Sequence, residues 1–516
     1  MSLKPSRRGV LMGMGATAAD AVLPVRANTR DDPMAYRSAG ELVEALAKRR
    51  VSSRELVDSA IARIEALDPT INAVVVRDFD RARAAAATAD AALAKGERWP
   101  LLGVPITVKE QFGVAGLPTT WGNLKFKDWR PEVDALAVQR LKAAGAIILG
   151  KTNVPVDLGD WQSYNEVYAT TNNPWDFGRS PGGSSGGAAA ALAAGFVPLE
   201  LGSDIGGSLR APAHFCGVFS HKPSIDLVPL RGAGPPQTPA IPGRVDFAVA
   251  GPMARSATDL ALALAVLAGP DELSDGIGYK LALPPPRHDR LGDFRVLAIG
   301  EHPLCPTSAT VSAALDGLAD RLAKLGCTVL RTSAKMPDLA LTTRNYVELL
   351  SAFFNTDLAP DDRLRVEAAA QALSPDDLSI AAARLRGLTM THAAWIKMGR
   401  VRSGLRARWQ ALFQDFDVVL CPPMPTVAFP HDHSSPMGAR ELDIDGKKVP
   451  YYNQLAWAGI ATSNGLPATT VPIAHTDSGL PIGVQIIGDY LDDNTTIAFA
   501  GLFEREFGGF SPPPSL

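Results

Sequence analysis

Residues Pro181 to Ser224 read PGGSSGGAAAALAAGFVPLELGSDIGGSLRAPAHFCGVFSHKPS. Two loops rich in glycine and serine, Gly182–Gly187 and Gly202–Arg210, flank an alanine-rich segment. Alanine favours a helix, and glycine allows neighbouring backbone segments to pack closely. The successive N–H groups of the second loop can converge on an oxyanion. This pattern predicts two serine-bearing loops that pack closely around a helix.

Lys109 ends an upstream apolar run, Gly103-Val-Pro-Ile-Thr-Val, that has the character of a short β-strand. A lysine in that place is expected to be desolvated, which lowers its pKa and lets it act as a neutral base. Taken alone, a glycine-rich loop is usually a tight turn, and a lysine after a strand is usually exposed. Together, the lysine and the two loops favour a catalytic site built on serine and lysine.

The rest of the chain alternates between helical and strand-like segments. Apolar residues at helical spacing predict helices over 38–49, 52–67, 78–95 and 134–144, and Ser52 with Glu55 fits a capping box. Short apolar runs predict strands at 103–108, 147–149, 418–420, 468–471 and 483–487. This alternation predicts an α/β fold with a large central mixed, mostly parallel, twisted β-sheet covered by helices on both faces.

Composition narrows the class of protein. The 516 residues are 46% hydrophobic and 20% charged, which excludes disorder as the dominant state. The net charge of −3 disfavours a nucleic-acid binder. The sequence has no uninterrupted run of about 18 apolar residues, so no transmembrane helix is expected. The four cysteines form no CxxC pair, so buried free thiols are expected rather than a disulfide framework or a structural zinc site.

Residues 1–27 require separate treatment. The pair Arg7-Arg8, an apolar run from Val10 to Val22 and the small-residue site Val25-Arg26-Ala27 resemble a twin-arginine export signal. Asp20 interrupts the apolar run, and a cytoplasmic tail is the alternative. The predicted location is therefore periplasmic or exported if the signal is real, and otherwise cytoplasmic.

Three other motifs have simpler interpretations. Gly145–Thr152 matches the phosphate-loop pattern G-x4-G-K-[ST], but its middle residues form a strand. Gly182–Gly186 matches G-x-S-x-G, the nucleophile elbow of α/β-hydrolases, but a loop precedes it where a strand is required. That interpretation stays open as an alternative, with late Asp432, His433 and His475 as partners. His431 and His433 lack a third metal ligand at useful spacing, so a solvated loop is favoured and no metal is expected.

The double serine loop resembles the signature of the amidase signature family, serine hydrolases that use a Ser-Ser-Lys triad. The blocks GVPITVKEQF (103–112), GPMARSATDL (251–260) and GLPATTVPI…GLPIGVQIIG (465–488) resemble the same family. The resemblance spans roughly residues 35 to 507. It implies a single amidase domain over 35–516, with a helical wrapper (35–98), a catalytic core (99–260), a variable substrate-side segment (281–445) and C-terminal core strands (446–507).

The resemblance also implies a role for each matching residue. Ser208 is the acyl nucleophile, Ser184 the bridging serine after a cis Gly183–Ser184 bond, and Lys109 the base. The expected oxyanion hole consists of the backbone N–H groups of Ile205, Gly206, Gly207 and Ser208. Asp204 and Arg210 are expected to pair and brace the loop, and Ser185 to hydrogen-bond within the triad. No metal or organic cofactor is implied.

The implied reaction is hydrolysis of a small, apolar or aryl carboxylic amide through an acyl-enzyme. Alternatives are an esterase or carbamate hydrolase with the same triad, and a glutaminase subunit of a tRNA-dependent amidotransferase. Trp161 and Tyr164 are candidate pocket residues, or equally core aromatics. The leaving-group side is expected to include Tyr346, Phe353 and Phe354. The expected partner is a small amide or ester, with no nucleic acid, and the sequence leaves monomer and homodimer open.

Overall fold

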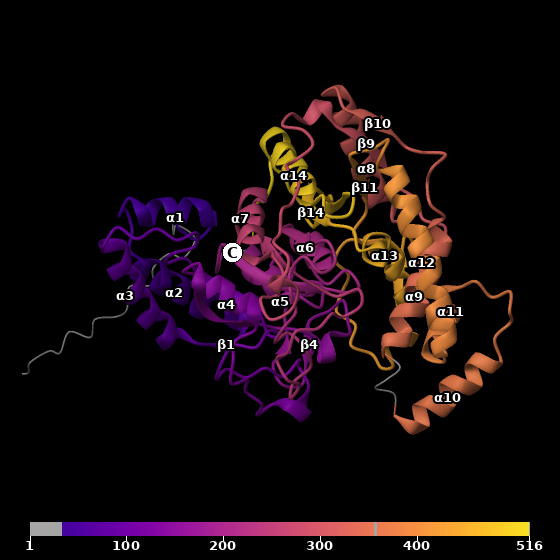
Figure 1. Ribbon diagram of the computed structural model, residues 1–516, viewed down its shortest axis with the longest axis horizontal. Helices are drawn as coiled ribbons and strands as arrows, with labels where there is room; N and C mark the ends of the chain where they lie inside the picture. Colours follow the sequence, from indigo (N-terminus) through magenta and orange to yellow (C-terminus); the bar gives the residue numbers. More distant parts are fainter. Residues whose placement is uncertain (1–33, 355–358, 515) are drawn as a thin grey trace, which may run out of the picture. The chain divides into compact units, whose positions relative to one another are not determined.

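The computed structural model describes residues 34–354, 359–514 and 516, so the export signal predicted in residues 1–27 lies outside the described residues. Pro33–Leu516 forms one compact unit (Figure 1). None of the helices found in the described residues combines the length and the apolar character that crossing a membrane would need.

A large mixed sheet organises the described part of the chain. Its eleven strands lie in the order β1 (Val74–Arg77), β3 (Ile147–Thr152), β2 (Pro105–Lys109), β6 (Leu199–Asp204), β8 (Val249–Ala254), β7 (Phe219–Lys222), β14 (Ala468–His475), β15 (Pro481–Ile487), β11 (Val418–Cys421), β9 (Arg295–Ala298) and β10 (Thr328–Leu330). Two short hairpins lie outside it: β4 (Tyr164–Asn165) with β5 (Ala169–Thr170), and β12 (Glu441–Ile444) with β13 (Lys447–Pro450).

The predicted large mixed sheet is confirmed, and its pairing is divided by position. Strands β3, β2 and β6 are parallel neighbours, as are β11, β9 and β10. Between these two groups the pairs from β6 through β8, β7, β14 and β15 to β11 are antiparallel. Every residue of β2, β3, β6, β7, β8, β11 and β15 is buried, which requires that both faces of the sheet are covered.

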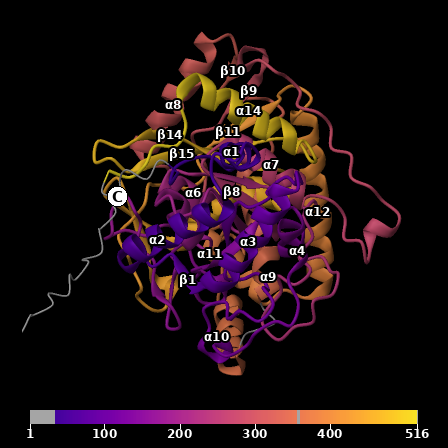
Figure 2. The same cartoon turned by 90° about the vertical axis from the view of Figure 1, so that its left-hand side faces the viewer.

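Helices from the two ends of the sequence cover the sheet. The N-terminal ones lie towards the viewer in Figure 2. The first two begin at serine caps, and capping boxes join Ser38 to Glu41 and Ser52 to Glu55, the latter as predicted. In chain order the helices are α1 (Ala39–Ala47), α2 (Ser53–Ile71), α3 (Phe79–Ala94), α4 (Leu136–Ala143), α5 (Gly186–Ala193), α6 (Arg210–Cys216), α7 (Ala257–Leu267), α8 (Ala309–Lys324), α9 (Leu339–Phe354), α10 (Pro360–Gln371), α11 (Ile380–Leu388), α12 (His392–Leu412), α13 (Leu455–Asn464) and α14 (Asp493–Phe507).

The alanine-rich segment between the serine loops forms α5, which is buried along its whole length. It packs against β2, β3, β6 and β8 and beside α6 (Figure 1). A Cβ atom added at Gly187 would lie 2.3 Å from the backbone nitrogen of Asn153, so only glycine permits this approach. Small side chains therefore bring the first serine loop directly onto the sheet.

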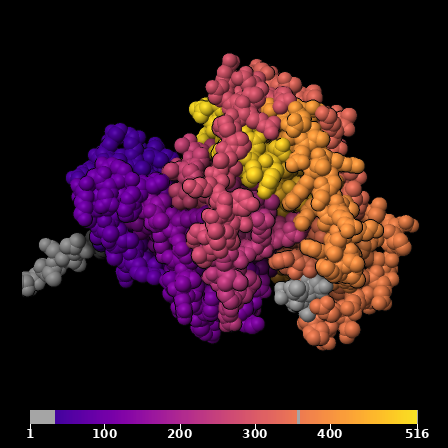
Figure 3. Space-filling view, in the orientation of Figure 1, coloured from indigo at the N-terminus to yellow at the C-terminus, as the bar shows by residue number. Residues whose placement is uncertain are grey.

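A group of helices from the second half of the chain packs together: α9 contacts α11, α12 and α13 (Figure 1). In Figure 3 yellow C-terminal residues appear on the surface between rose and orange residues, so segments distant in sequence share one face. All four cysteines are free and buried. The middle residues of the phosphate-loop match lie in or next to β3, as the strand interpretation expected.

Candidate active site

The site begins where two parallel strands end at the same edge of the sheet. In β2 and β6, Val108 is paired with Leu201, so the strand ends at Lys109 and Asp204 lie near each other. The polypeptide leaves β6 through the second serine loop and enters α6 at Arg210. Because the carboxyl ends of parallel strands meet at one edge, the lysine and that loop come together although they are distant in sequence.

Lys109 is fully buried and lies between two serine hydroxyls. Its Nζ is 2.7 Å from Ser184 Oγ and donates to Ser203 Oγ at 2.9 Å. Ser203 in turn donates to Gln111 Oε1 at 2.5 Å. Burial lowers the pKa of Lys109 to about 7, although Asp204 and Glu200 act in the opposite direction. A large fraction of Lys109 is therefore neutral near pH 7 and able to accept a proton.

Ser184 follows a cis peptide bond from Gly183, as expected from the resemblance. A Cβ atom at Gly183 would lie 2.3 Å from the carbonyl oxygen of Asp160, so a glycine is required there. Ser184 is 2% exposed and Ser208 6% exposed. Both predicted serines are thus nearly enclosed.

Ser185 ties the two serine loops to each other. Its N–H donates to the carbonyl of Ser208 at 3.2 Å, and its hydroxyl donates to the carbonyl of Ser203 at 3.2 Å. It also accepts a bond from the Ser203 N–H at 3.4 Å. Because Ser185 directly follows Ser184, these bonds hold the backbone of Ser208 close to Ser184.

Asp204 organises the second loop from inside. One of its oxygens accepts the N–H of Gly207 at 2.9 Å, and the other accepts the N–H of Leu209 at 3.0 Å. The predicted pair with Arg210 is present at 2.8 Å and fully buried. Burial works to raise the pKa of Asp204, but the charge and hydrogen bonds of Arg210 outweigh it and lower the pKa to about 2. The carboxylate therefore stays ionised.

This arrangement separates the expected oxyanion donors. The Gly207 N–H is already engaged by Asp204. The N–H groups of Ile205, Gly206 and Ser208 have no acceptor among the described residues. Three of the four expected donors are therefore without a hydrogen-bond acceptor among the described residues, and the Gly207 N–H contributes to the shape of the loop.

The predicted pocket aromatics have different surroundings. Trp161 is 6% exposed, and its indole N–H donates to the carbonyl of Gly206 at 2.8 Å. Tyr164 accepts from Arg440 at 2.7 Å and stacks on His433, with ring centroids 3.7 Å apart. Trp161 thus contacts the candidate oxyanion loop, whereas Tyr164 belongs to a polar cluster outside it.

His433, which stacks on Tyr164, belongs to that polar cluster. Arg440 pairs with Asp160 at 2.6 Å, and Tyr451 donates to the same carboxylate at 2.7 Å. His431 contacts the side chain of Asn172 at 3.2 Å. Within the described residues, no group of three or more His, Cys, Asp or Glu side chains is arranged to hold a metal ion.

Several contributors were not singled out from the sequence. Ser203 and Gln111 form hydrogen bonds around Lys109, and their only sequence signal was proximity to the motifs.

The aromatic residues expected on the leaving-group side have different surroundings. Tyr346 is fully buried, and its hydroxyl donates to the carbonyl of Ile205 at 2.6 Å. Phe353 and Phe354 are 42% and 43% exposed near the end of α9.

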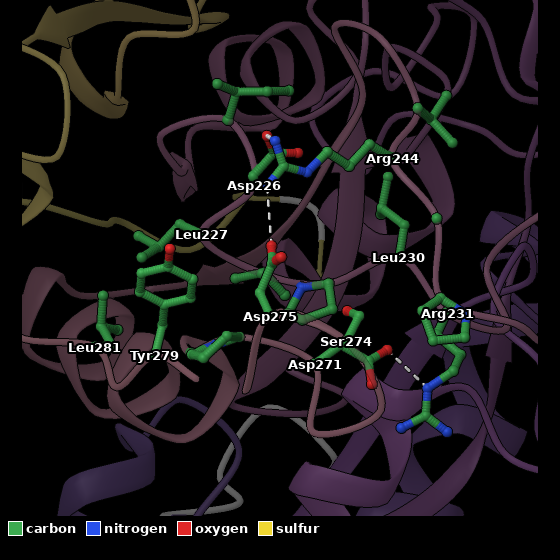
Figure 4. Close-up of a pocket in the computed structure, with 18 of the residues that line it drawn as sticks. Asp226, Leu227, Leu230, Arg231, Arg244, Asp271, Ser274, Asp275, Tyr279 and Leu281 are labelled. Carbon is green, nitrogen blue, oxygen red and sulfur yellow. Dashed lines mark hydrogen bonds and ion pairs between the residues drawn. The ribbon is translucent and has the colours of Figure 1, made fainter. Parts of the chain in front are cut away.

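A cavity of about 660 Å³ lies elsewhere, between the loops at 225–248 and 269–281 (Figure 4). Arg244 pairs with Asp275 and Arg231 with Asp271 along its wall, each at 2.8 Å. None of the predicted catalytic residues lines it. Despite its size, its charged groups are largely paired, so we do not place the reaction there.

Residues 55–497 match the family model described as Amidase. A glutamyl-tRNA(Gln) amidotransferase subunit from Anaeromyxobacter sp. (strain K) is 35% identical over 504 residues, covering 93% of this chain and 98% of the relative. The corresponding protein from Roseiflexus castenholzii (strain DSM 13941 / HLO8) is 34% identical over 496 residues, covering 92% and 96%.

Solved structures show the same architecture. A bacterial aryl acylamidase of the amidase signature enzymes superposes with a TM-score of 0.74 at 27% identity, covering 92% of this chain and 96% of its own. A 6-aminohexanoate cyclic dimer hydrolase complexed with substrate gives a TM-score of 0.72 at 26% identity, covering 93% and 99%.

Proposed function

The chain belongs to the amidase signature family, and on this premise we propose that it hydrolyses a small, apolar or aryl carboxylic amide. The proposed catalytic residues are Lys109, Ser184 and Ser208. One observation carries the assignment: the buried Lys109 Nζ lies 2.7 Å from Ser184 Oγ, with a pKa lowered to about 7 by burial. A neutral amine at that distance is a suitable acceptor for the serine proton.

In the proposed mechanism Ser184 passes its proton to Lys109 and takes the proton of Ser208. The Ser208 oxygen attacks the carbonyl carbon, and the developing oxyanion faces the open N–H groups of Ile205, Gly206 and Ser208. The C–N bond breaks as Ser184 protonates the leaving nitrogen and recovers a proton from Lys109. Water then attacks the acyl carbon and passes one proton to Ser184, which again gives its own to Lys109. The bond to the Ser208 oxygen breaks as Ser184 returns a proton to that oxygen and recovers one from Lys109, and the acid leaves.

The assay compares purified wild-type protein with Ser208→Ala and Ser184→Ala. A fluorophosphonate probe followed by peptide mapping is expected to modify Ser208 in the wild type and to leave Ser208→Ala unmodified. A panel of anilides, aliphatic amides, esters and carbamates then ranks the substrate classes. Modification of Ser184 instead of Ser208 would overturn the roles assigned here and favour the nucleophile-elbow alternative.

A second candidate is the glutaminase component of a tRNA-dependent amidotransferase. It is supported by the similarity to the Anaeromyxobacter glutamyl-tRNA(Gln) amidotransferase subunit, which extends over 93% of this chain. The two candidates differ in a direct assay: the first requires turnover of an anilide by the chain alone. Hydrolysis of L-glutamine, appearing only when partner proteins are added, would favour the second.

Export would bear on the same choice, because tRNA is cytoplasmic. We propose that residues 1–27 direct export through the pair Arg7-Arg8. A reporter fused after residue 40 is expected to reach the periplasm, and a version with Arg7→Lys and Arg8→Lys is expected to stay in the cytoplasm. Equal cytoplasmic retention of both would contradict export.

A further inference from the structure

Two buried aromatic side chains donate hydrogen bonds to backbone carbonyls of the loop that carries Ser208. The Tyr346 hydroxyl donates to the carbonyl of Ile205 at 2.6 Å, and the Trp161 indole donates to the carbonyl of Gly206 at 2.8 Å. Tyr346 comes from α9 and Trp161 from the segment before the first serine loop. Both are in the same apolar cluster, with Tyr346 at 0% and Trp161 at 6% exposure.

The geometry of the peptide unit gives these contacts a consequence. In a trans peptide the carbonyl oxygen of one residue and the N–H of the next point in opposite directions. A donor that holds the Ile205 carbonyl therefore sets the direction of the Gly206 N–H, and one that holds the Gly206 carbonyl sets that of the Gly207 N–H.

The two peptide units then differ in what their inner ends meet. The Gly207 N–H donates to Asp204 at 2.9 Å, so Trp161 and Asp204 hold both ends of that unit. The Gly206 N–H has no acceptor among the described residues. The unit held by Tyr346 therefore has one end fixed and the other free for an incoming oxygen.

We propose that Tyr346 and Trp161 are positioning residues, with the Tyr346 hydroxyl aiming the Gly206 N–H at the oxyanion and Trp161 with Asp204 locking the adjacent peptide. This inference rests on the proposed function and adds the groups that preorganise its oxyanion hole. A hydrogen bond to a carbonyl also strengthens the N–H of the same peptide as a donor.

The surroundings of Tyr346 fit this role. Burial raises the pKa of its phenol well above the ordinary value, so it remains a donor at all working pH values. Phe247 packs edge-on against its ring, with centroids 5.4 Å apart. A Cβ atom at Gly459 would lie 2.7 Å from the Tyr346 ring, so the glycine leaves the space that the ring occupies. The ring is confined from several sides, which keeps the hydroxyl in place.

The test compares Tyr346→Phe and Trp161→Phe with two matched controls. Tyr168→Phe removes a hydroxyl that contacts Glu110 at 3.1 Å, and Trp175→Phe removes an indole that donates to the Cys216 carbonyl at 3.0 Å. The readouts are kcat and KM on an anilide, and the inhibition constant of phenylboronic acid, which forms a tetrahedral anionic adduct with a serine. Thermal unfolding shows which variants are folded.

Tyr346→Phe is expected to lower kcat by about ten- to hundred-fold with KM nearly unchanged, because only the charged tetrahedral state uses the aimed N–H. Boronate inhibition is expected to weaken by a similar factor, Trp161→Phe to show a smaller effect of the same kind, and the controls to stay near wild type. If Tyr346→Phe does not fold, Trp161→Phe and Gly459→Ala, which displaces the ring, serve in its place.

Two results would overturn the inference: wild-type boronate affinity in folded Tyr346→Phe, or equal losses in the Tyr168→Phe control. Fluorophosphonate labelling of wild-type Ser208 tests the proposed function separately. Labelling together with an unaffected Tyr346→Phe variant refutes the positioning role alone. Absence of labelling and of turnover in the wild type refutes both.

Discussion

Lys109 on β2 and Lys151 on β3 lie on neighbouring strands and share one unusual condition. Both are fully buried, and burial lowers the pKa of Lys109 to about 7 and that of Lys151 to about 8. Their contacts differ. Lys109 meets the hydroxyls of Ser184 and Ser203, whereas Lys151 donates to the carbonyl of Pro118 and the hydroxyl of Thr119, both at 2.6 Å.

The register of the sheet explains the difference. Lys109 is paired with Thr152, so Lys151, one residue earlier, projects from the opposite face. Among the hydrogen bonds of the described residues, Ser184 of the first serine loop meets Lys109, whereas Lys151 meets Pro118 and Thr119. Burial and a lowered pKa are therefore insufficient to identify a catalytic base, because the face of the sheet decides which groups the amine can serve.

The strongest test of this comparison replaces each lysine in turn. Lys109→Met is expected to lower kcat by about 10³- to 10⁴-fold, because it removes the proposed base of the serine relay. Lys151→Met removes an equally buried amine and is expected to leave kcat per folded molecule within about twofold. The kcat of both variants is measured on an anilide, and thermal unfolding shows whether each variant is folded. Comparable losses in the two variants would show that either lysine affects the site only through folding.

The buried ion pair between Asp204 and Arg210, beside Lys109, is expected to contribute to the free energy of unfolding. Asp204→Asn is expected to cost about 3–5 kcal/mol of unfolding free energy, because it leaves the buried Arg210 without its charge partner. The control is Asp415→Asn, whose pair with Lys335 is half exposed and is expected to contribute less than about 1 kcal/mol. Urea denaturation measures both, and equal losses would mean that the buried pair has no special weight.

The pH profile separates the two amines again. In the proposed mechanism Lys109 must be neutral to accept a proton, and burial lowers its pKa to about 7. The value of kcat/KM is therefore expected to rise about tenfold per pH unit below 7 and to level off above it. Lys151→Met is expected to keep the wild-type midpoint. A changed midpoint in Lys151→Met would show that Lys151 contributes to the titration, which would contradict its assignment to Lys109 alone.

The smallest expected effect concerns the second hydroxyl beside Lys109. Ser203→Ala removes an acceptor at 2.9 Å from Nζ but leaves Ser184 in place. We expect kcat to fall about three- to tenfold, because the amine loses one of two groups that hold its orientation. Steady-state kinetics on the same anilide measure it, with Ser220→Ala as a buried serine control on β7. An unchanged kcat would show that Ser184 alone orients the lysine.

Much of the site was readable from local motifs. The strand ending in Lys109, the helix after the first serine loop and the capping box at Ser52 follow from patterns a few residues long, and the structure contains each. The family resemblance supplied the roles of Ser184 and Ser208 and the cis bond at Gly183. These features depend on residue type and spacing, which the sequence displays directly.

Other features depend on contacts between distant segments. Tyr346 reaches the Ile205 carbonyl across 141 residues, and no pattern around either residue announces that bond. The sequence placed the Gly207 N–H among the four expected oxyanion donors, but in the structure this N–H donates to Asp204. The sequence left Trp161 as either a pocket residue or a core aromatic, and its indole hydrogen bond to the Gly206 carbonyl is visible only in the structure.

Residue type and spacing predicted the α/β class and singled out Lys109 and the two serine loops as a candidate site, because helix caps, strand runs and glycine loops are local; the proposed roles of Ser184 and Ser208 came from the family resemblance. Tertiary structure alone decided the antiparallel centre of the sheet, the opposite faces of Lys109 and Lys151, and the donors that hold the oxyanion loop. The reason is physical: strand pairing and hydrogen bonding to a backbone carbonyl join groups that any residue possesses, so their partners are set only when the chain has folded.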